Sequence, residues 1–290
     1  MTTKSTLILF FLLSFGWIAQ AQKMPVKEEE TIRRTLTFKN TDDPLLTLHN
    51  IEGNVNIEAY DGKTVEMEAR QVLSAKSKQD MLSAREEVKL VSRVEGDIIL
   101  IYPETPETKA RLDGRDLNYS INRRNEDYRF HYDFTIRIPQ NISLKASTIN
   151  DGEVFLKNVS GKEIYLSNVN GAIKAENISG LVEASTVNGE ITISIAKQPE
   201  RKTHFHTVNG EINVMLPEDL KADVRFKSMN GDLFTDYENV KVGPSIEKAS
   251  EGRGLKKTYR IDKSALMKVN GGGPLLDFEV LNGNVYVKKY

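Results

Sequence analysis

The residues best suited to chemistry are two histidines and one glycine-rich segment. His204 and His206 are two positions apart in an alternating stretch, so we expect both imidazoles on one face of a strand, where they could share a metal ion. Two ligands do not define a metal site and the sequence specifies no third, so the favoured interpretation is two surface histidines. Residues 268–273 (KVNGGG) lack the Lys-Ser or Lys-Thr ending of a phosphate-binding loop, and we expect a flexible linker there.

Carboxylates recur in the sequence without forming a recognisable acid/base pair. Glu153, Glu190 and Glu211 each directly follow a glycine, and we expect a stacked outer row that discourages pairing with other molecules. The sequence contains neither the nucleophile motif of serine hydrolases nor the zinc motif of metalloproteases. It also has no cysteine, which excludes disulfides, thiolate ligands and lipidation on cysteine. We therefore expect no catalytic residues, no metal ligands and no cofactor.

A repeated sequence unit must position these residues. From Thr148 to Tyr237 the chain repeats a small polar residue, an apolar residue, one or two turn residues and glycine, followed by a short alternating run. The unit also occurs at 50–57 and at 281–287. Glycine permits a positive φ, which a sharp corner requires. We expect structural turn glycines at Gly53, Gly152, Gly161, Gly171, Gly180, Gly189, Gly210, Gly231 and Gly283.

Two folds fit alternation of this kind. In a β-solenoid, each coil of roughly 20 residues has two strands and like residues stack along the axis. In an antiparallel β-meander or sandwich, each Asn-Gly pair is a hairpin turn. A solenoid requires like residues to recur at matched positions, whereas a meander does not. We therefore expect an all-β, single-stranded-coil β-solenoid or β-helix-like roll with Asn/Thr-x-x-Gly turns. Four residues should then stack in a structural polar ladder: Asn158, Asn168, Asn177 and Thr186.

The ends and insertions of the chain have their own signatures. An apolar run ending in Ala19-Gln20-Ala21 predicts a signal peptide over 1–21, cleaved between Ala21 and Gln22. We expect a disordered lead-in over 22–35 and one β-repeat domain over 36–290, with polar insertions at 103–128 and 238–262. The spacing of Met81, Ala84 and Val88 predicts one short surface helix near 78–86.

Composition narrows the compartment and the partners. The formal net charge is −1, and removal of the one lysine in the signal peptide changes it to −2, so we expect no nucleic-acid partner. No second apolar stretch approaches the length of a membrane span, so we expect no transmembrane segment in the mature chain. The expected location is the periplasm or the cell surface, without a lipoprotein anchor.

Three features resemble the bacterial "putative adhesin" domain family of unknown function, which is common in exported proteins of Bacteroidetes. They are the repeat array, the strand pair around Glu95-Gly96-Asp97, and the segment FTIRIPQNISLKASTINDGEV before the first repeat. The resemblance covers about residues 40–290. It implies a right-handed or roll-like β-solenoid at the cell envelope and supplies no catalytic residues.

These observations together favour an exported, non-enzymatic adhesin-like or cell-envelope interaction protein that presents a repetitive surface to an unknown protein or glycan. One alternative is a polysaccharide-active enzyme on a β-helix, which carboxylates clustered in a groove would favour. The other is a periplasmic envelope-stress or signalling accessory protein. The two insertions are candidate positions for a specific partner.

Overall fold

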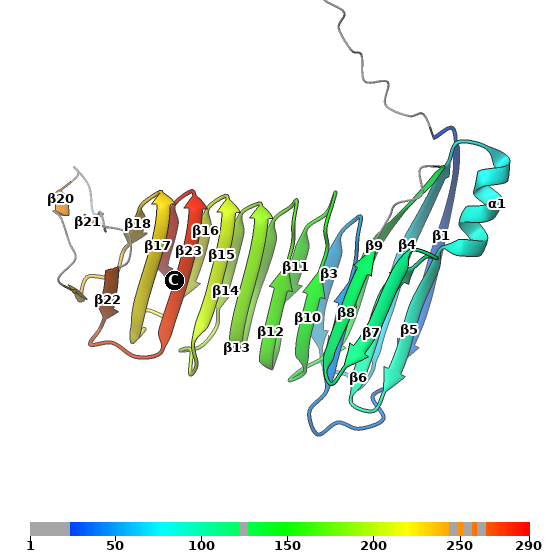
Figure 1. Ribbon diagram of the computed structural model, residues 1–290. Helices are drawn as coiled ribbons and strands as arrows, with labels where there is room; N and C mark the ends of the chain where they lie inside the picture. The colour runs from blue at the N-terminus through cyan, green and yellow to red at the C-terminus, as the bar shows by residue number, and fades with distance from the viewer. Residues whose placement is uncertain (1–23, 122–126, 244–248, 252–256, 260–264) are drawn as a thin grey trace, which may run out of the picture.

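Two β-sheets lie face to face and wind into a solenoid (Figure 1). The structure, a computed structural model, describes residues 24–121, 127–243, 249–251, 257–259 and 265–290. The predicted signal peptide and the Ala21–Gln22 cleavage site lie outside these residues. Among the described residues, no helix is long and apolar enough to cross a membrane.

The order of the strands across each sheet differs from their order in the sequence. Sheet A contains β1 (Val26–Leu36), β4 (Val65–Ala75), β9 (Tyr128–Pro139), β3 (Val55–Tyr60), β11 (Val154–Lys157), the first half of β13 (Ile173–Asn188), β14 (Ile191–Ile195), β16 (Ile212–Leu216), β24 (Val285–Lys289), β18 (Leu233–Thr235), β21 (Lys257–Tyr259) and β20 (Ala249–Glu251). Sheet B contains β5 (Lys89–Glu95), β6 (Ile98–Glu104), β2 (Leu45–His49), β10 (Ser143–Ser147), β12 (Ser160–Ser167), the second half of β13, β15 (Thr203–Asn209), β23 (Leu275–Asn282), β17 (Ala222–Asn230), β22 (Ala265–Val269) and β19 (Val240–Val242).

The predicted solenoid is confirmed, and the meander is excluded. From β9 to β18 in sheet A and from β6 to β17 in sheet B, neighbouring strands are parallel, whereas a meander would make them antiparallel. Each coil consists of a sheet B strand followed by a sheet A strand. Antiparallel strands flank this parallel centre at both ends of each sheet.

Columns of like residues fill the space between the sheets. Phe205 stacks on Phe278 with ring centroids 5.2 Å apart, and Phe226 follows in the next strand. On the facing sheet, β-branched residues occupy matched positions, as Ile191 does beside Ile173 and Ile212. All of these side chains are buried. Because every second residue points inward, the intervening residues form continuous rows on the two outer faces.

The turn glycines are required mainly by close packing and less by their φ angles. Seven of them stack from coil to coil, and a Cβ atom on any of the last six would lie 1.8–2.0 Å from the carbonyl oxygen of the preceding glycine: Gly53, Gly152, Gly171, Gly189, Gly210, Gly283 and Gly231. A positive φ occurs at Gly53, Gly180, Gly210 and Gly283 among the nine predicted glycines. The expectation of a positive φ at every corner is therefore wrong. Gly161 and Gly180 form a separate stack at another corner of the coil.

Polar side chains inside the corner cap the glycine carbonyls. Thr148 donates to the carbonyl of Gly53, Asn168 to Gly152, Thr186 to Gly171 and Thr207 to Gly189, over 2.9–3.1 Å. Each of these donors lies one coil away from its acceptor. A buried carbonyl group left without a partner destabilises the fold, so these side chains satisfy the corner as it stacks.

The four residues predicted as one polar ladder do not form one row. Asn168 and Thr186 belong to the buried caps, whereas Asn177 donates to Asn158 at the corner of Gly161 and Gly180. The continuous ladder consists of the residues just before the turn glycines, where each side-chain amide donates to its neighbour over 2.8–2.9 Å: Asn150, Asn170, Asn188, Asn209, Asn282 and Asn230. At Asn168 and Thr186 the prediction places the ladder two residues too early, because it follows the alternation of the strand and not the turn.

Two segments predicted as irregular are ordered. Over residues 26–35 the expected disorder is wrong, because β1 (Val26–Leu36) pairs with β4 along its whole length, while residues 22 and 23 lie outside the described part of the chain. Val26, Ile32 and Leu36 are half-buried and pack against the core, but the many charged residues between them make this apolar pattern hard to recognise in the sequence. The insertion at 103–128 contains a hairpin of β7 (Thr108–Asp113) and β8 (Asp116–Ile121). Long-range contacts, which local patterns do not reveal, stabilise both segments.

The structure describes part of the second insertion and all of the C-terminal repeat. Within 238–262 it describes residues 238–243, which include β19, and the short strands β20 and β21. The repeat at 281–287 does not close the end of the array. Instead, β23 lies between β15 and β17, and β24 lies between β16 and β18. The last coil is therefore inserted between two earlier coils.

The predicted surface helix is confirmed as α1 (Lys78–Glu87). The Ser77 hydroxyl caps its first turn by accepting a hydrogen bond from the Asp80 amide. Met81 and Ala84 are buried, which places this thin apolar stripe over the antiparallel strands at the N-terminal end of the solenoid (Figure 1).

Replacing a stacked glycine should weaken the solenoid more than replacing a glycine in a free turn. In Gly171→Ala the new Cβ would lie 2.0 Å from the Gly152 carbonyl oxygen, so the coils must separate. We expect a loss of roughly 3 kcal/mol or more in the free energy of unfolding. Gly96→Ala is the control, because nothing lies within 4 Å of its Cβ and only its φ of 65° is unfavourable. Its expected cost is about 1 kcal/mol by urea denaturation.

Two buried threonines should respond in opposite ways to replacement by valine. Thr186→Val removes the donor to the Gly171 carbonyl and should cost about 1–3 kcal/mol. The Thr203 hydroxyl is buried without a hydrogen-bond partner and lies in the column between Val182 and Leu276. Thr203→Val should therefore be neutral or stabilising. Thermal and urea unfolding of the two variants measures the contrast, and equal losses would contradict the proposed role of the caps.

Candidate functional site

A groove of about 490 Å³ lies along the outer face of sheet B. Its floor comes from β2, β10, β12, β13 and β15, and the hairpin of β7 and β8 closes one end with Asp116 and Leu117. The groove therefore crosses the strands and follows the solenoid axis. An elongated site of this kind is open to a ligand that extends over several coils.

A row of three serines crosses the floor of the groove. Ser147 is paired in register with Ser167, and Ser167 with Ser185, on three successive strands. They alternate with the inward-facing Ala146, Leu166 and Ala184, which fixes the hydroxyls on the outer face. Parallel strands are about 4.8 Å apart, so the row presents small hydrogen-bonding groups at a regular spacing.

A second row of larger side chains runs beside the serines. Lys145, Tyr165, Glu183 and His204 are neighbours on successive strands. The Lys145 Nζ lies 5.6 Å from the centre of the Tyr165 ring and forms an ion pair with Asp116 of the hairpin. The groove thus has an aromatic surface between charged groups, as a binding site for a polar ligand would need.

His49 joins the hairpin to the serine row. Its ring stacks on Tyr119 at 5.5 Å, and its Nδ1 lies 2.6 Å from the Ser147 Oγ. Burial lowers the pKa of His49 to about 4, although a backbone hydrogen bond with Leu117 acts in the opposite direction. His49 is therefore neutral near pH 7. Its Nδ1 and the Ser147 hydroxyl share a hydrogen bond, which ties the hairpin contact to the serine row.

A buried carboxylate fixes the far end of the second row. The Asp277 side chain is only 2% exposed and accepts hydrogen bonds from the Arg225 Nε at 2.7 Å and Nη2 at 2.5 Å. Lys202 and His204 also contact it, at 3.2 and 3.3 Å. Burial would raise the pKa of Asp277, but the hydrogen bonds from Arg225 and Lys202 outweigh it and lower that pKa to about 2.

The two histidines singled out by the sequence share one face, as predicted. The rings of His204 and His206 are stacked with centroids 6.4 Å apart, while Phe205 between them points into the core. His204 contacts Asp277, and His206 lies 4.0 Å from Glu279. In the part of the chain that the structure describes, no group of three or more His, Asp, Glu or Cys residues is arranged to hold a metal ion.

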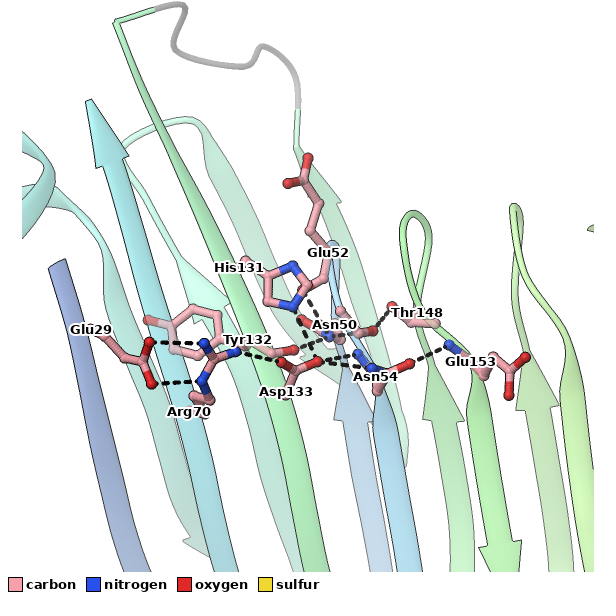
Figure 2. A network of polar contacts seen from close by, with 11 residues as sticks. Glu29, Asn50, Glu52, Asn54, Arg70, His131, Tyr132, Asp133, Thr148 and Glu153 are labelled. Atoms are coloured by element: carbon pink, nitrogen blue, oxygen red, sulfur yellow. Dashed lines mark hydrogen bonds and ion pairs between the residues drawn. The ribbon is translucent and has the colours of Figure 1, made fainter. Parts of the chain in front are cut away.

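A second polar network lies where the solenoid meets the antiparallel strands (Figure 2). Arg70 bonds Glu29 at 2.7 and 2.8 Å and Asp133 at 3.2 Å, and Asp133 accepts two hydrogen bonds from Asn54. Burial raises the pKa of Asp133, but the hydrogen bonds from Asn54 and the contact with His131 outweigh it and lower that pKa. Since these groups satisfy one another across β1, β4, β9 and β3, we interpret the network as a structural joint.

The predicted glutamates lie away from the groove. Glu153, Glu190 and Glu211 occupy one column at the N-terminal ends of strands of sheet A, and Ala172 lies between the first two. Glu153 pairs with Lys174, and Glu190 accepts hydrogen bonds from Thr192 and Asn213. The glycine-rich segment at 268–273 ends β22 and turns into β23, where the Asn270 side chain donates to the Leu220 carbonyl.

Sequence reasoning missed the serine row, although a signal for it exists. Ser147, Ser167 and Ser185 each lie one residue after an inward-facing Ala or Leu in successive sheet B strands. The outward positions could have been aligned in the same way as the inward ones. Tyr119 and Asp116 had no such signal, because their contacts with sheet B depend on how the hairpin folds back.

Removing the buried carboxylate should destabilise the protein in a pH-dependent way. Because folding lowers the pKa of Asp277 from 3.8 to about 2, the ionised group stabilises the fold above pH 4, and this contribution is lost as the pH falls toward 2. Asp277→Asn should therefore be less stable than the wild type near neutral pH, and the difference should shrink in acid. Urea denaturation across this range measures it, with the exposed Glu58→Gln as control. A difference that does not change with pH would contradict the assignment.

Several solved structures are similar to this chain at low sequence identity. No protein of curated description matches the sequence. A "putative cell adhesion protein" from Clostridium sporogenes is 11% identical, with a TM-score of 0.43 over 91% of this chain and 100% of the other. A "putative adhesin" from Bacteroides fragilis is 9% identical, with a TM-score of 0.39 over 90% and 97%. A "putative lipid binding protein" from Parabacteroides distasonis is 11% identical, with a TM-score of 0.29 over 90% and 96%.

The family match covers most, but not all, of the parallel strands of the solenoid. It begins within β9, spans the coils from β10 to β18 and leaves out the inserted C-terminal coil of β23 and β24. Residues 135–264 match the family described as Toastrack DUF4097, and the resemblance to an adhesin-like domain family of unknown function is thereby confirmed.

Proposed function

We propose that this protein is an exported, non-enzymatic, adhesin-like protein that binds a protein or glycan chain at the cell envelope through the groove on sheet B. The observation that carries the proposal is the serine row, because three small hydroxyls at the spacing of the coils suit a ligand that extends along the axis. Repeat solenoids use extended surfaces of this kind for binding.

The side chains around the serines support recognition of a polar ligand. Tyr165 offers an aromatic face, and Lys145 and Glu183 on either side of it offer a donor and an acceptor. The hairpin closes one end of the groove, so a ligand that entered it would contact Asp116. This gives the insertion at 103–128 a defined role beside the solenoid.

The pairing of Ser147 with His49 supports binding more than nucleophilic catalysis. In serine hydrolases a histidine in this position takes the proton of the serine, which requires a pKa near the working pH. The pKa of His49 is lowered to about 4, so it is a weak base at neutral pH. Its stacking on Tyr119 indicates instead that it holds the hairpin against the sheet.

A second candidate, a polysaccharide-active enzyme, is favoured by one observation. Asp116 and Glu183 both line the groove, with Tyr165 between Lys145 and Glu183 on the floor. Glycosidases place two carboxylates on either side of the bond that they cleave. Here Asp116 is already paired with Lys145, which favours binding. Release of reducing ends from acidic polysaccharides by the wild type, abolished in Glu183→Gln, would establish the enzyme instead.

Binding should depend on the groove and not on the opposite face of the solenoid. We expect residues 22–290 to retain a glycan or envelope protein on a glycan array or in an envelope pull-down. Tyr165→Ala should weaken that binding about tenfold or more, which corresponds to about 1.4 kcal/mol. Tyr286→Ala is the matched control, because Tyr286 stacks on Phe234 on the outer face of sheet A. Equal losses in the two variants, or no ligand at all, would contradict the proposal.

A further inference from the structure

β1 leaves one long edge of sheet A free. It runs over 11 residues and pairs only with β4 among the described residues. A strand with one neighbour directs alternate amide and carbonyl groups away from the sheet, where they can accept another strand. Shortness, bulges, proline and charged side chains are the usual protections of an edge strand. β1 is long and unbroken and has only its charged side chains.

A groove accompanies the free edge. It has a volume of about 660 Å³ and is lined by seven consecutive residues of β1, from Glu28 to Arg34. Its floor continues onto Gln71 and Leu73 of β4, and the opposite wall comes from Arg85 of α1 and from Lys89 and Leu90 of β5. The half-buried Ile32 lies in the middle part of β1. A hollow of this length beside an unpaired strand fits a second extended strand.

The charges of β1 are complementary to the same strand running in the opposite direction. Residues 28–30 are glutamates and residues 33–34 are arginines. A parallel copy would place like charges together. An antiparallel copy centred near Ile32 instead brings the glutamate end of one strand to the arginine end of the other. Opposite charges on facing strands are favourable, and like charges are unfavourable.

The ion pairs within the chain select the register. Glu28 pairs with Arg85, Glu29 with Arg70, and Arg33 with Glu68. Glu30 and Arg34 are exposed and have no ion-pair partner among the residues that the structure describes. A two-fold axis at Ile32 places Glu30 of each copy opposite Arg34 of the other, and both side chains lie on the same face because the positions differ by four.

We propose that two copies of this chain associate through antiparallel pairing of their β1 strands about Ile32. The contact is the same on both copies, as in a closed two-fold dimer. Sheet A then continues from one solenoid into the other, and the two solenoids extend in opposite directions from the joint. This interface is independent of the proposed groove on sheet B, and the dimer would carry that groove twice.

Charge reversal tests the pairing directly. Residues 22–290 should form a dimer by sedimentation velocity at micromolar concentration. In Glu30→Arg or in Arg34→Glu, two like-charged pairs replace two opposite ones, and the dimer should dissociate about tenfold more readily. Glu58→Arg is the control, since Glu58 is exposed on β3, which has a paired strand on both sides.

Mixing the two single variants provides the decisive result. Glu30→Arg leaves only arginine at positions 30 and 34, whereas Arg34→Glu leaves only glutamate there. The two variants are therefore complementary, and their equimolar mixture should regain the dimer as a heterodimer. Circular dichroism of each variant checks that it is folded. A wild-type monomer at all concentrations would overturn the proposal. So would a dimer that ignores the reversals, or folded variants whose mixture stays monomeric.

Discussion

The close approach of each turn glycine to the carbonyl oxygen of the preceding coil is the constraint on which the structure depends. A side chain at Gly171 or Gly189 would enter the space of that oxygen, so only glycine lets the coils stack at the spacing of parallel strands. The same approach brings Thr186 and Thr207 within hydrogen-bond distance of a glycine carbonyl in the neighbouring coil. The asparagine ladder outside the corner follows the same register. The positions of the turn glycines, the buried threonine donors and the asparagine ladder thus all depend on this one contact.

That register also explains why the groove on sheet B is regular. Once the coils are aligned, each outward position repeats at the same height, and the pairing of the strands places Ser147, Ser167 and Ser185 in a row. What distinguishes the groove from the rest of the surface is the hairpin, which adds Asp116 and Tyr119 from outside the repeat. The repeat supplies the regular surface, and the insertion supplies the local chemistry.

The sequence was sufficient to predict the features that depend on neighbours along the chain. Alternation and glycine spacing predicted the solenoid, and the spacing of Met81 and Ala84 predicted α1. The failures involve partners distant in sequence. β1 was missed because its stability comes from β4, some 30 to 50 residues later. The hairpin contact of Tyr119 with His49 spans 70 residues. The polar ladder was misplaced because alternation indicates which face a residue occupies, whereas the turn decides which amides meet.

The inserted last coil has a consequence for the order in which the chain folds. Residues 275–289 lie between the coil of β15 and β16 and the coil of β17 and β18, both of which precede them in the sequence. The ribosome synthesises the chain from its N-terminus. β23 is hydrogen-bonded to β15 on one side and to β17 on the other. The coil of β17 and β18 therefore cannot reach its final place until the last coil has been synthesised. A polypeptide that ends before residue 275 would lack β23 and β24. Its strand β17 would then have no neighbour joining it to β15, and the stack would be open to proteolysis at that point.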